Sequence, residues 1–199
     1  MWRVGERAFD CSGRTLVMGI LNVTPDSFSD GGEFLDPEAA VFHGVQMAAD
    51  GADLVDVGGE STRPGSDAVP PREEIGRVVP VIARLLDEIP SVPISIDTRK
   101  AEVAAAALDA GATIVNDVSG GRDPGMFELV RERGAAVVLM HMKGEPKTMQ
   151  ETPTYDDVVG EVHEHLRERI EAAELAGIDP GRIAIDPGIG FGKGLEHNL

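Results

Sequence analysis

The sequence predicts an α/β protein built from six successive strand–helix units. Three observations support this fold class. Short apolar runs of the kind that form buried strands recur along the chain, and each is followed by a polar or glycine-containing segment. Longer stretches with apolar residues three and four positions apart, typical of helices, separate these runs. The 199 residues are enough for one substantial core, so we expect residues 1–199 to form a single domain.

The expected strands are the short apolar runs, preceded by a small hairpin in residues 1–14, where Gly5 and Gly13 mark turns. They cover residues 16–21, 54–57, 93–96, 113–115, 136–140 and 183–185. Repeated βα units build parallel sheets, and two architectures use them: an open doubly wound sheet and a closed eight-stranded barrel.

The expected helices lie where the apolar period is helical and where capping residues mark the ends. Asp36 supplies an N-cap and Pro37 a first-turn proline, and Gly51 closes the first helix. Thr98 is placed to cap the alanine-rich third helix. The expected helices cover residues 38–50, 71–89, 99–110, 124–133 and 155–176.

The chain is strongly acidic, with 18 Lys and Arg against 35 Asp and Glu and a formal net charge of −17. A surface this negative repels nucleic acid and anionic lipid, so we expect neither a nucleic acid nor a membrane as partner. No apolar run approaches the roughly 20 residues of a membrane helix, and the start lacks a secretory signal, which indicates the cytoplasm. The single Cys11 cannot form an internal disulfide and fits a reducing compartment.

Polar side chains gather where the first strand ends. The loop after it holds the amide of Asn22, the carboxylates of Asp26 and Asp30, and the ring of Phe28. Such a density of polar groups at a strand end suggests a binding site, although an ordinary strand-to-helix loop explains the same composition equally well.

Further polar residues follow the later strands. Asn22, Asp97, Asn116, His141 and Asp186 all stand at expected carboxyl ends of strands, which converge on one face of a barrel. Two carboxylates in such a mouth need N–H donors, so the set suits the amide and amino edge of a nitrogen heterocycle. For each aspartate alone, helix capping or an arginine pair is the alternative.

The histidines are weaker candidates. A histidine at a strand end, as at His141, is more often a satisfied supporting group than a catalyst. His163 and His165 are two residues apart on a helix, do not share a face, and are expected to be solvated.

Two further segments suggest ligand contacts. Thr62 and Arg63, after a glycine pair, make a plausible grip for phosphate oxygens, with a surface salt bridge as the alternative. The glycine-rich residues 188–194 lack the pattern of a phosphate-binding P-loop, so we expect these glycines to allow a tight turn and Phe191 to offer a stacking face.

The motifs together resemble the dihydropteroate synthase family of folate biosynthesis. Residues 19–32 (GILNVTPDSFSDGG) and 58–65 (GGESTRPG) carry the most specific part of the resemblance. The family's later signatures are matched in order at residues 97–98, 116–120, 138–142 and 186–192. The resemblance implies a (β/α)8 TIM barrel, of which this chain supplies about six units. It also implies an enzyme that joins 6-hydroxymethyl-7,8-dihydropterin diphosphate to 4-aminobenzoate, releasing diphosphate. Such an enzyme would be a target of sulfonamides.

Carried over position by position, the resemblance also assigns roles. Asp97, Asn116 and Asp186 would hold the pterin edge, and Met140 and Phe191 would line its pocket. Thr62 and Arg63 would bind the phosphates, and Asn22 would ligate Mg²⁺ on the diphosphate. Phe28 and Pro64 would help to form the aminobenzoate pocket, and Asp26 and Asp30 would order the loops.

The implied chemistry is a substitution at the pterin methylene carbon. Carboxylates such as Asp97 and Asp186 would stabilise the positive charge that develops on the pterin, while Mg²⁺ and Arg63 stabilise the leaving diphosphate. The aniline nitrogen is already a nucleophile at neutral pH, so no strong general base is expected. The family resemblance also implies a homodimer.

One departure sets the limits of the expectation. The family pattern continues with two more strands that carry further ligand-binding groups, so we expect residues 1–199 alone to lack activity. Two alternatives remain: the pterin-binding barrel of corrinoid-dependent methyltransferases, and a pterin-binding fragment without catalysis. The long first loop and the Ser-Thr-Arg-Pro turn speak against the methyltransferase.

Overall fold

A parallel sheet of six strands organises the computed structural model, which describes residues 1–24, 36–61, 66, 68–144, 149 and 153–199. The strands are β3 (Met18–Asn22), β4 (Leu54–Gly58), β5 (Ile94–Asp97), β6 (Ile114–Asp117), β7 (Ala136–Met140) and β8 (Ile183–Asp186). They neighbour one another in chain order, β3 to β8. In a doubly wound sheet the order of the strands reverses part-way across the sheet. The sequential order found here is that of a TIM barrel.

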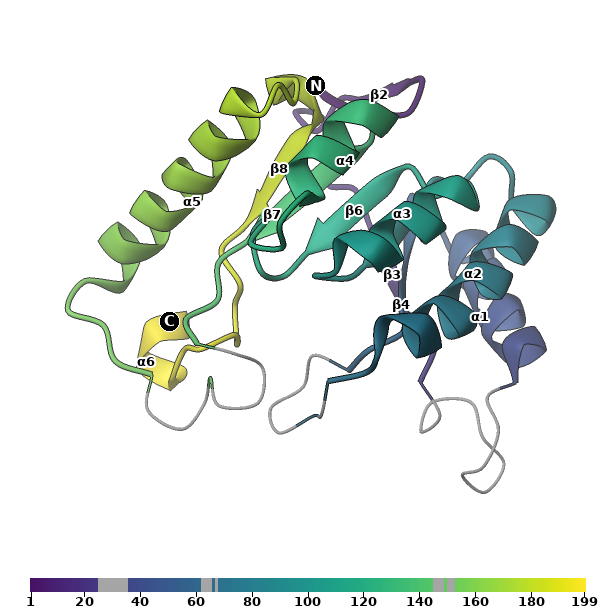
Figure 1. The fold of residues 1–199 in the computed structure, drawn as a ribbon, viewed down its shortest axis with the longest axis horizontal. Helices are drawn as coiled ribbons and strands as arrows, with labels where there is room; N and C mark the ends of the chain where they lie inside the picture. The colour runs from purple at the N-terminus through teal and green to yellow at the C-terminus, as the bar shows by residue number, and fades with distance from the viewer. Residues whose placement is uncertain (25–35, 62–65, 67, 145–148, 150–152) are drawn as a thin grey trace.

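Helices follow the strands in the expected alternation (Figure 1). They are α1 (Pro37–Ala49), α2 (Pro71–Glu88), α3 (Ala101–Asp109), α4 (Met126–Arg133), α5 (Val158–Leu175), the 3₁₀ turn η1 (Pro180–Arg182) and α6 (Leu195–Asn198). The Asp36 carboxylate accepts a hydrogen bond from the Glu38 N–H at 3.0 Å, which confirms the predicted cap of α1. Within the described residues, no helix combines the length and apolar character needed to cross a membrane.

The sheet has two different faces, because side chains alternate along each strand. The outer face carries a large apolar core shared with the helices. Its buried strand residues are Leu21, Val55, Val57, Ile94, Ile96, Val115, Val137 and Leu139. The inner face instead changes from apolar to polar toward the carboxyl ends of the strands, and this face holds the candidate site.

An amino-terminal hairpin closes the opposite end of the inner face. Strands β1 (Trp2–Val4) and β2 (Arg7–Phe9) pair antiparallel, as predicted. Val4 packs with Leu54, Ile114 and Ala136 in a separate buried cluster. Figure 1 shows this hairpin at one end of the molecule and α6 at the other. The carboxyl ends of the strands are thus the end at which a ligand can enter.

The predicted cap of α3 is wrong. The helix begins at Ala101, whose N–H donates to the Asp123 carboxylate at 2.9 Å. The Thr98 hydroxyl donates to Glu74 Oε1 at 2.7 Å and accepts, at 3.3 Å, from the N–H of Lys100, which precedes the helix. Glu74 is only 1% exposed, and a carboxylate in that position requires donors more strongly than a helix end near solvent does.

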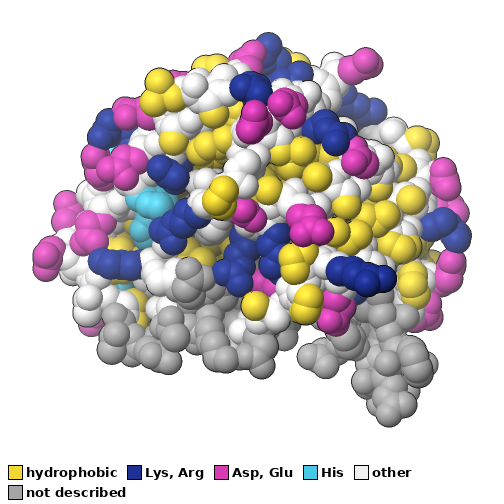
Figure 2. Space-filling model, viewed as in Figure 1, with side chains coloured by type: hydrophobic (Ala, Val, Ile, Leu, Met, Phe, Trp, Pro, Cys, Tyr) yellow, Lys and Arg dark blue, Asp and Glu magenta, His cyan; other side chains and the backbone are white. Residues whose placement is uncertain are grey.

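Cations on the surface stand among carboxylates, as Figure 2 shows for one face of the molecule. Arg84 of α2 pairs with Glu38 of α1 at 2.8 Å, and both side chains are about half exposed or more. Arg167 pairs with Glu164 and Glu171 along α5. Exposed pairs of this kind contribute little to stability, so the apolar core is the main stabilising feature.

Candidate functional site

Three of the predicted site residues lie in one row across the sheet. In the strand register Asn22 is opposite Gly58, Gly58 is opposite Asp97, and Asp97 is opposite Asn116. Residues that are paired in a parallel sheet point to the same face. The row therefore crosses four adjacent strands at their carboxyl ends, on the inner face.

Gly58 leaves open space in the middle of this row. A Cβ atom added to Gly58 would lie 3.4 Å from Asp97 Oδ2 and 3.6 Å from Asn22 Oδ1. The two oxygens therefore border one small volume above a glycine that has no side chain to fill it. A ligand atom can approach the strand backbone there and meet both oxygens.

One oxygen of the Asp97 carboxylate has no donor in the part of the chain that the structure describes. This oxygen is Oδ1, which is buried. Burial raises the pKa of Asp97 well above its ordinary value, and the nearby negative charges, Asp56 first and then Glu74 and Asp117, raise the pKa further. An unpaired buried carboxylate is costly, so this group is suited to a ligand that brings N–H donors.

Asp56 holds Asn116 of the row in place, and it was not identified as a site residue from the sequence. It lies two residues before Gly58 on the same face and is only 2% exposed. Its Oδ2 accepts a hydrogen bond of 2.8 Å from Asn116 Nδ2, and burial raises the pKa of Asp56. With its N–H₂ group held this way, Asn116 has its amide oxygen left for a ligand. A charged residue inside a buried apolar strand was the signal that could have identified it.

Asp186 belongs to the same inner face, one step further along the strands. Asn116, Val138 and Ala184 are paired in register, and Asp186 follows Ala184 by two residues on β8. Its Oδ1 accepts a hydrogen bond of 2.7 Å from the Gly188 N–H. The structure thus brings all three predicted pterin-edge residues, Asp97, Asn116 and Asp186, to one face.

Comparison with known proteins decides the family. The family model described as "Pterin binding enzyme" matches residues 18–199. A dihydropteroate synthase of Mycobacterium leprae is 54% identical over 92% of this chain and 64% of its own. That of Synechocystis is 46% identical over 98% of this chain and 68% of its own. This chain belongs to the dihydropteroate synthase family.

Solved structures of dihydropteroate synthases agree. A Yersinia pestis dihydropteroate synthase with a sulfonamide drug complex has a TM-score of 0.91 at 45% identity, covering 98% of this chain and 70% of its own. The Xanthomonas albilineans enzyme with 4-aminobenzoic acid has a TM-score of 0.86 at 56% identity, covering 94% and 66%. The chain thus spans about two thirds of the length of these dihydropteroate synthases, and its six strands are arranged as in the (β/α)8 fold.

The glycine-rich turn after β8 packs closely on the end of β7. Gly188 has a φ of 68°, and a Cβ there would lie 2.0 Å from the His141 carbonyl oxygen. A Cβ on Gly192 would lie 2.4 Å from the Lys143 carbonyl oxygen. This confirms the prediction of a tight turn built on glycine. Phe191 packs against the cluster that contains Met140, so these two predicted pocket residues belong to one apolar group.

A buried lysine, absent from the predictions, holds this turn. Lys193 is 4% exposed and donates to the Gly188 carbonyl at 2.9 Å, and its Nζ lies 2.9 Å from His141 Nδ1. Burial lowers the pKa of Lys193 to about 8. Burial and then the charge of Lys193 lower the pKa of His141 to about 4, so this histidine is a neutral acceptor near pH 7. His141 is therefore the satisfied supporting group that was expected.

The expectation for His165 is wrong, because its ring is half-buried. It lies 4.9 Å from the His141 ring in an edge-on arrangement, and burial lowers its pKa. Figure 2 shows histidine side chains gathered on the α5 side of the molecule. His163 is exposed as expected, since two residues along a helix turn a side chain to another face.

Six predicted site residues lie outside the described part of the chain. They are Asp26, Phe28, Asp30, Thr62, Arg63 and Pro64. Their placement in the site is therefore not established by the structure, and their roles stay predictions.

The described residues fit Mg²⁺ only in part. Among them there is no group of three or more His, Cys, Asp or Glu side chains that could hold a metal ion. The Asn22 and Asp97 oxygens above Gly58 are of the right chemistry, and Mg²⁺ commonly takes one or two protein oxygens with substrate phosphates and water. This donor set suits a cation that arrives with a diphosphate.

Proposed function

We propose that the complete enzyme joins 6-hydroxymethyl-7,8-dihydropterin diphosphate to 4-aminobenzoate, forming 7,8-dihydropteroate and diphosphate. The observation that carries the proposal is the buried Asp97 Oδ1, which has no hydrogen-bond partner among the described residues, on a side chain that stands in one register row with Asn22 and Asn116. Dihydropteroate synthases from Xanthomonas albilineans, solved with 4-aminobenzoic acid and with 7,8-dihydropteroate, support it.

In this proposal the inner face binds the pterin. Asp97 and Asp186 accept hydrogen bonds from pterin N–H groups, and Asn116 offers its amide oxygen. Met140 and Phe191 contact the flat ring. The raised pKa of Asp97 fits this role, because donors on the ligand restore the favourable environment that burial removes.

The phosphates of the substrate are bound by residues other than those that hold the pterin ring. Thr62 and Arg63 bind them, and Asn22 would hold Mg²⁺, which would supply positive charge to the diphosphate. Phe28 and Pro64 form part of the aminobenzoate pocket, and Asp26 and Asp30 order the loops.

The reaction breaks the carbon–oxygen bond to diphosphate and forms a carbon–nitrogen bond to the aniline, which then loses a proton. Asp97 and Asp186 stabilise positive charge on the pterin, and Arg63 stabilises negative charge on the leaving group. We also propose that the enzyme acts as a homodimer in the cytoplasm.

Release of diphosphate by the purified complete enzyme tests this function. It should require both substrates and Mg²⁺, and dihydropteroate should appear in equal amount. Binding of the pterin diphosphate without product would favour a binding protein, and methyl transfer from a methylated pterin to a corrinoid would favour the methyltransferase alternative.

A further inference from the structure

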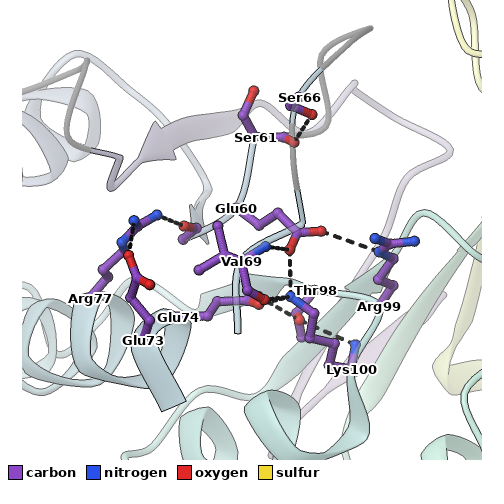
Figure 3. A network of polar contacts seen from close by, with 11 residues as sticks. Glu60, Ser61, Ser66, Val69, Glu73, Glu74, Arg77, Thr98, Arg99 and Lys100 are labelled. Atoms are coloured by element: carbon purple, nitrogen blue, oxygen red, sulfur yellow. Dashed lines mark hydrogen bonds and ion pairs between the residues drawn. The ribbon is translucent and has the colours of Figure 1, made fainter. Parts of the chain in front are cut away.

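A buried network of charges lies beside the candidate site (Figure 3). Lys100 Nζ donates to Glu60 Oε2 and to Glu74 Oε2, each at 2.5 Å. The side chains are 16%, 8% and 1% exposed, respectively. Arg99 Nε contacts the other Glu60 oxygen at 3.2 Å, so two carboxylates meet two cations.

The network joins three elements at the level of the site. Glu60 comes two residues after Gly58 of β4, Glu74 is on α2, and Lys100 comes three residues after Asp97 of β5. Lys100 and its partner Glu60 thus closely follow two adjacent strands whose last residues, Asp97 and Gly58, belong to the row.

The same groups hold both ends of the segment 61–68. Glu60 directly precedes this segment, and Val69 directly follows it. The Val69 N–H donates to Glu60 Oε2 at 2.8 Å, and Lys100 Nζ donates to the Val69 carbonyl at 2.7 Å. Lys100 therefore bonds to groups at both ends of the segment.

We propose that Lys100, with Glu60 and Glu74, is a positioning group that fixes the ends of the 61–68 segment relative to Asp97. The inference deepens the proposed function, because the segment carries Thr62 and Arg63, to which that function assigns the phosphates. Lys100 does not touch substrate. It sets the spacing between the pterin carboxylate and the phosphate-binding segment, so its loss should weaken the contribution of the diphosphate to binding more than that of the pterin.

The test compares two ligands on the complete enzyme. Dissociation constants are measured for 6-hydroxymethyl-7,8-dihydropterin and for its diphosphate, and their ratio gives the gain due to the diphosphate. In Lys100→Met this gain should fall by about tenfold or more, because a small displacement of binding groups costs this much or more. Lys100→Arg keeps the charge and should restore most of the gain.

Arg84→Met is the matched control, because it removes one positive charge from an exposed pair on α2. It should leave the gain unchanged. If Lys100→Met does not fold, Glu60→Ala decides the question, since it retains the Lys100–Glu74 pair and removes the acceptor that bonds to Lys100 and to the Val69 N–H. Equal weakening of both ligands, or a lower melting temperature with an unchanged gain, would overturn the proposal. A wild-type enzyme that forms no dihydropteroate would instead overturn the proposed function.

Discussion

At the scale of single residues, binding and stability make opposite demands on Asp97. Its Oδ1 is buried and has no donor within the described part of the chain, and its raised pKa means that the folded state binds a proton more tightly than the unfolded state. The stability of the ligand-free protein therefore falls as the pH rises above the ordinary pKa of aspartate, and the loss is complete above the folded pKa. A protein selected for stability alone would place an uncharged residue there.

Asp97→Asn should therefore stabilise the ligand-free protein near pH 7, raising its melting temperature by about 2 °C or more, because it removes a buried charge. The gain should shrink as the pH falls toward the ordinary pKa of aspartate. Asp53→Asn is the contrasting control, since Arg14 lowers the pKa of Asp53 to about 2 and the substitution should be destabilising. Thermal unfolding that shows Asp97→Asn less stable than wild type would contradict this account.

His141 should make the protein sensitive to moderate acid. Its folded pKa is about 4, against 6.5 ordinarily, so its contribution to stability is complete above pH 6.5 and is lost as the pH falls toward 4. The loss is at most about 3 kcal/mol. Denaturant unfolding between pH 4 and 7 should show a weaker pH dependence in His141→Gln than in wild type. Parallel curves for the two proteins would count against a neutral, buried His141.

At the scale of elements, the turn after β8 depends on two glycines to different degrees. Gly188→Ala would place a Cβ against the His141 carbonyl, whereas Gly190→Ala would meet nothing within 4 Å although its φ is 84°. Both substitutions strain the backbone, but only the first forces β7 and the turn apart. Pterin affinity should fall much more in Gly188→Ala than in Gly190→Ala. Equal affinities in the two variants would show that the close packing does not position Asp186.

The elements themselves could be predicted from sequence, whereas their buried polar contacts could not. The spacing of apolar residues and the positions of turn residues locate each strand to within a few residues, because local sterics and burial determine where strands form. The start of α3 was misplaced because Thr98 serves Glu74, a residue 24 positions away. The buried Lys193 and half-buried His165 were missed for the same reason, since long-range packing determines their surroundings.

At the scale of the whole molecule, the family motifs pointed to the inner-face residues before the fold was known. Asp97, Asn116 and Asp186 are far apart in sequence and come to one face of the sheet only through parallel register. The register row with Asn22 and the support from Asp56 required the structure. Sequence pattern alone left a doubly wound sheet possible, and the sequential strand order removes it.

The open sides of β3 and β8 lead to a prediction for residues 1–199 expressed alone. Within the described residues each strand has one neighbour only, and Ile20 and Ile185 are 52% and 51% exposed. Unpaired edges beside apolar side chains favour association. Gel filtration should show aggregation without dihydropteroate formation, whereas a protein extended by two further βα units should be soluble and active. A monodisperse, active polypeptide of residues 1–199 would contradict this.

The central claim is that the row from Asn22 to Asn116 is the floor of a pterin site with Asp97 as its charged acceptor. Calorimetric titration of 6-hydroxymethyl-7,8-dihydropterin into the complete enzyme and its Asp97→Asn variant tests the claim most directly. The account predicts measurable binding by wild type and a loss of roughly 2–5 kcal/mol in the variant, which stays folded. A variant that binds the pterin as tightly as wild type would contradict it.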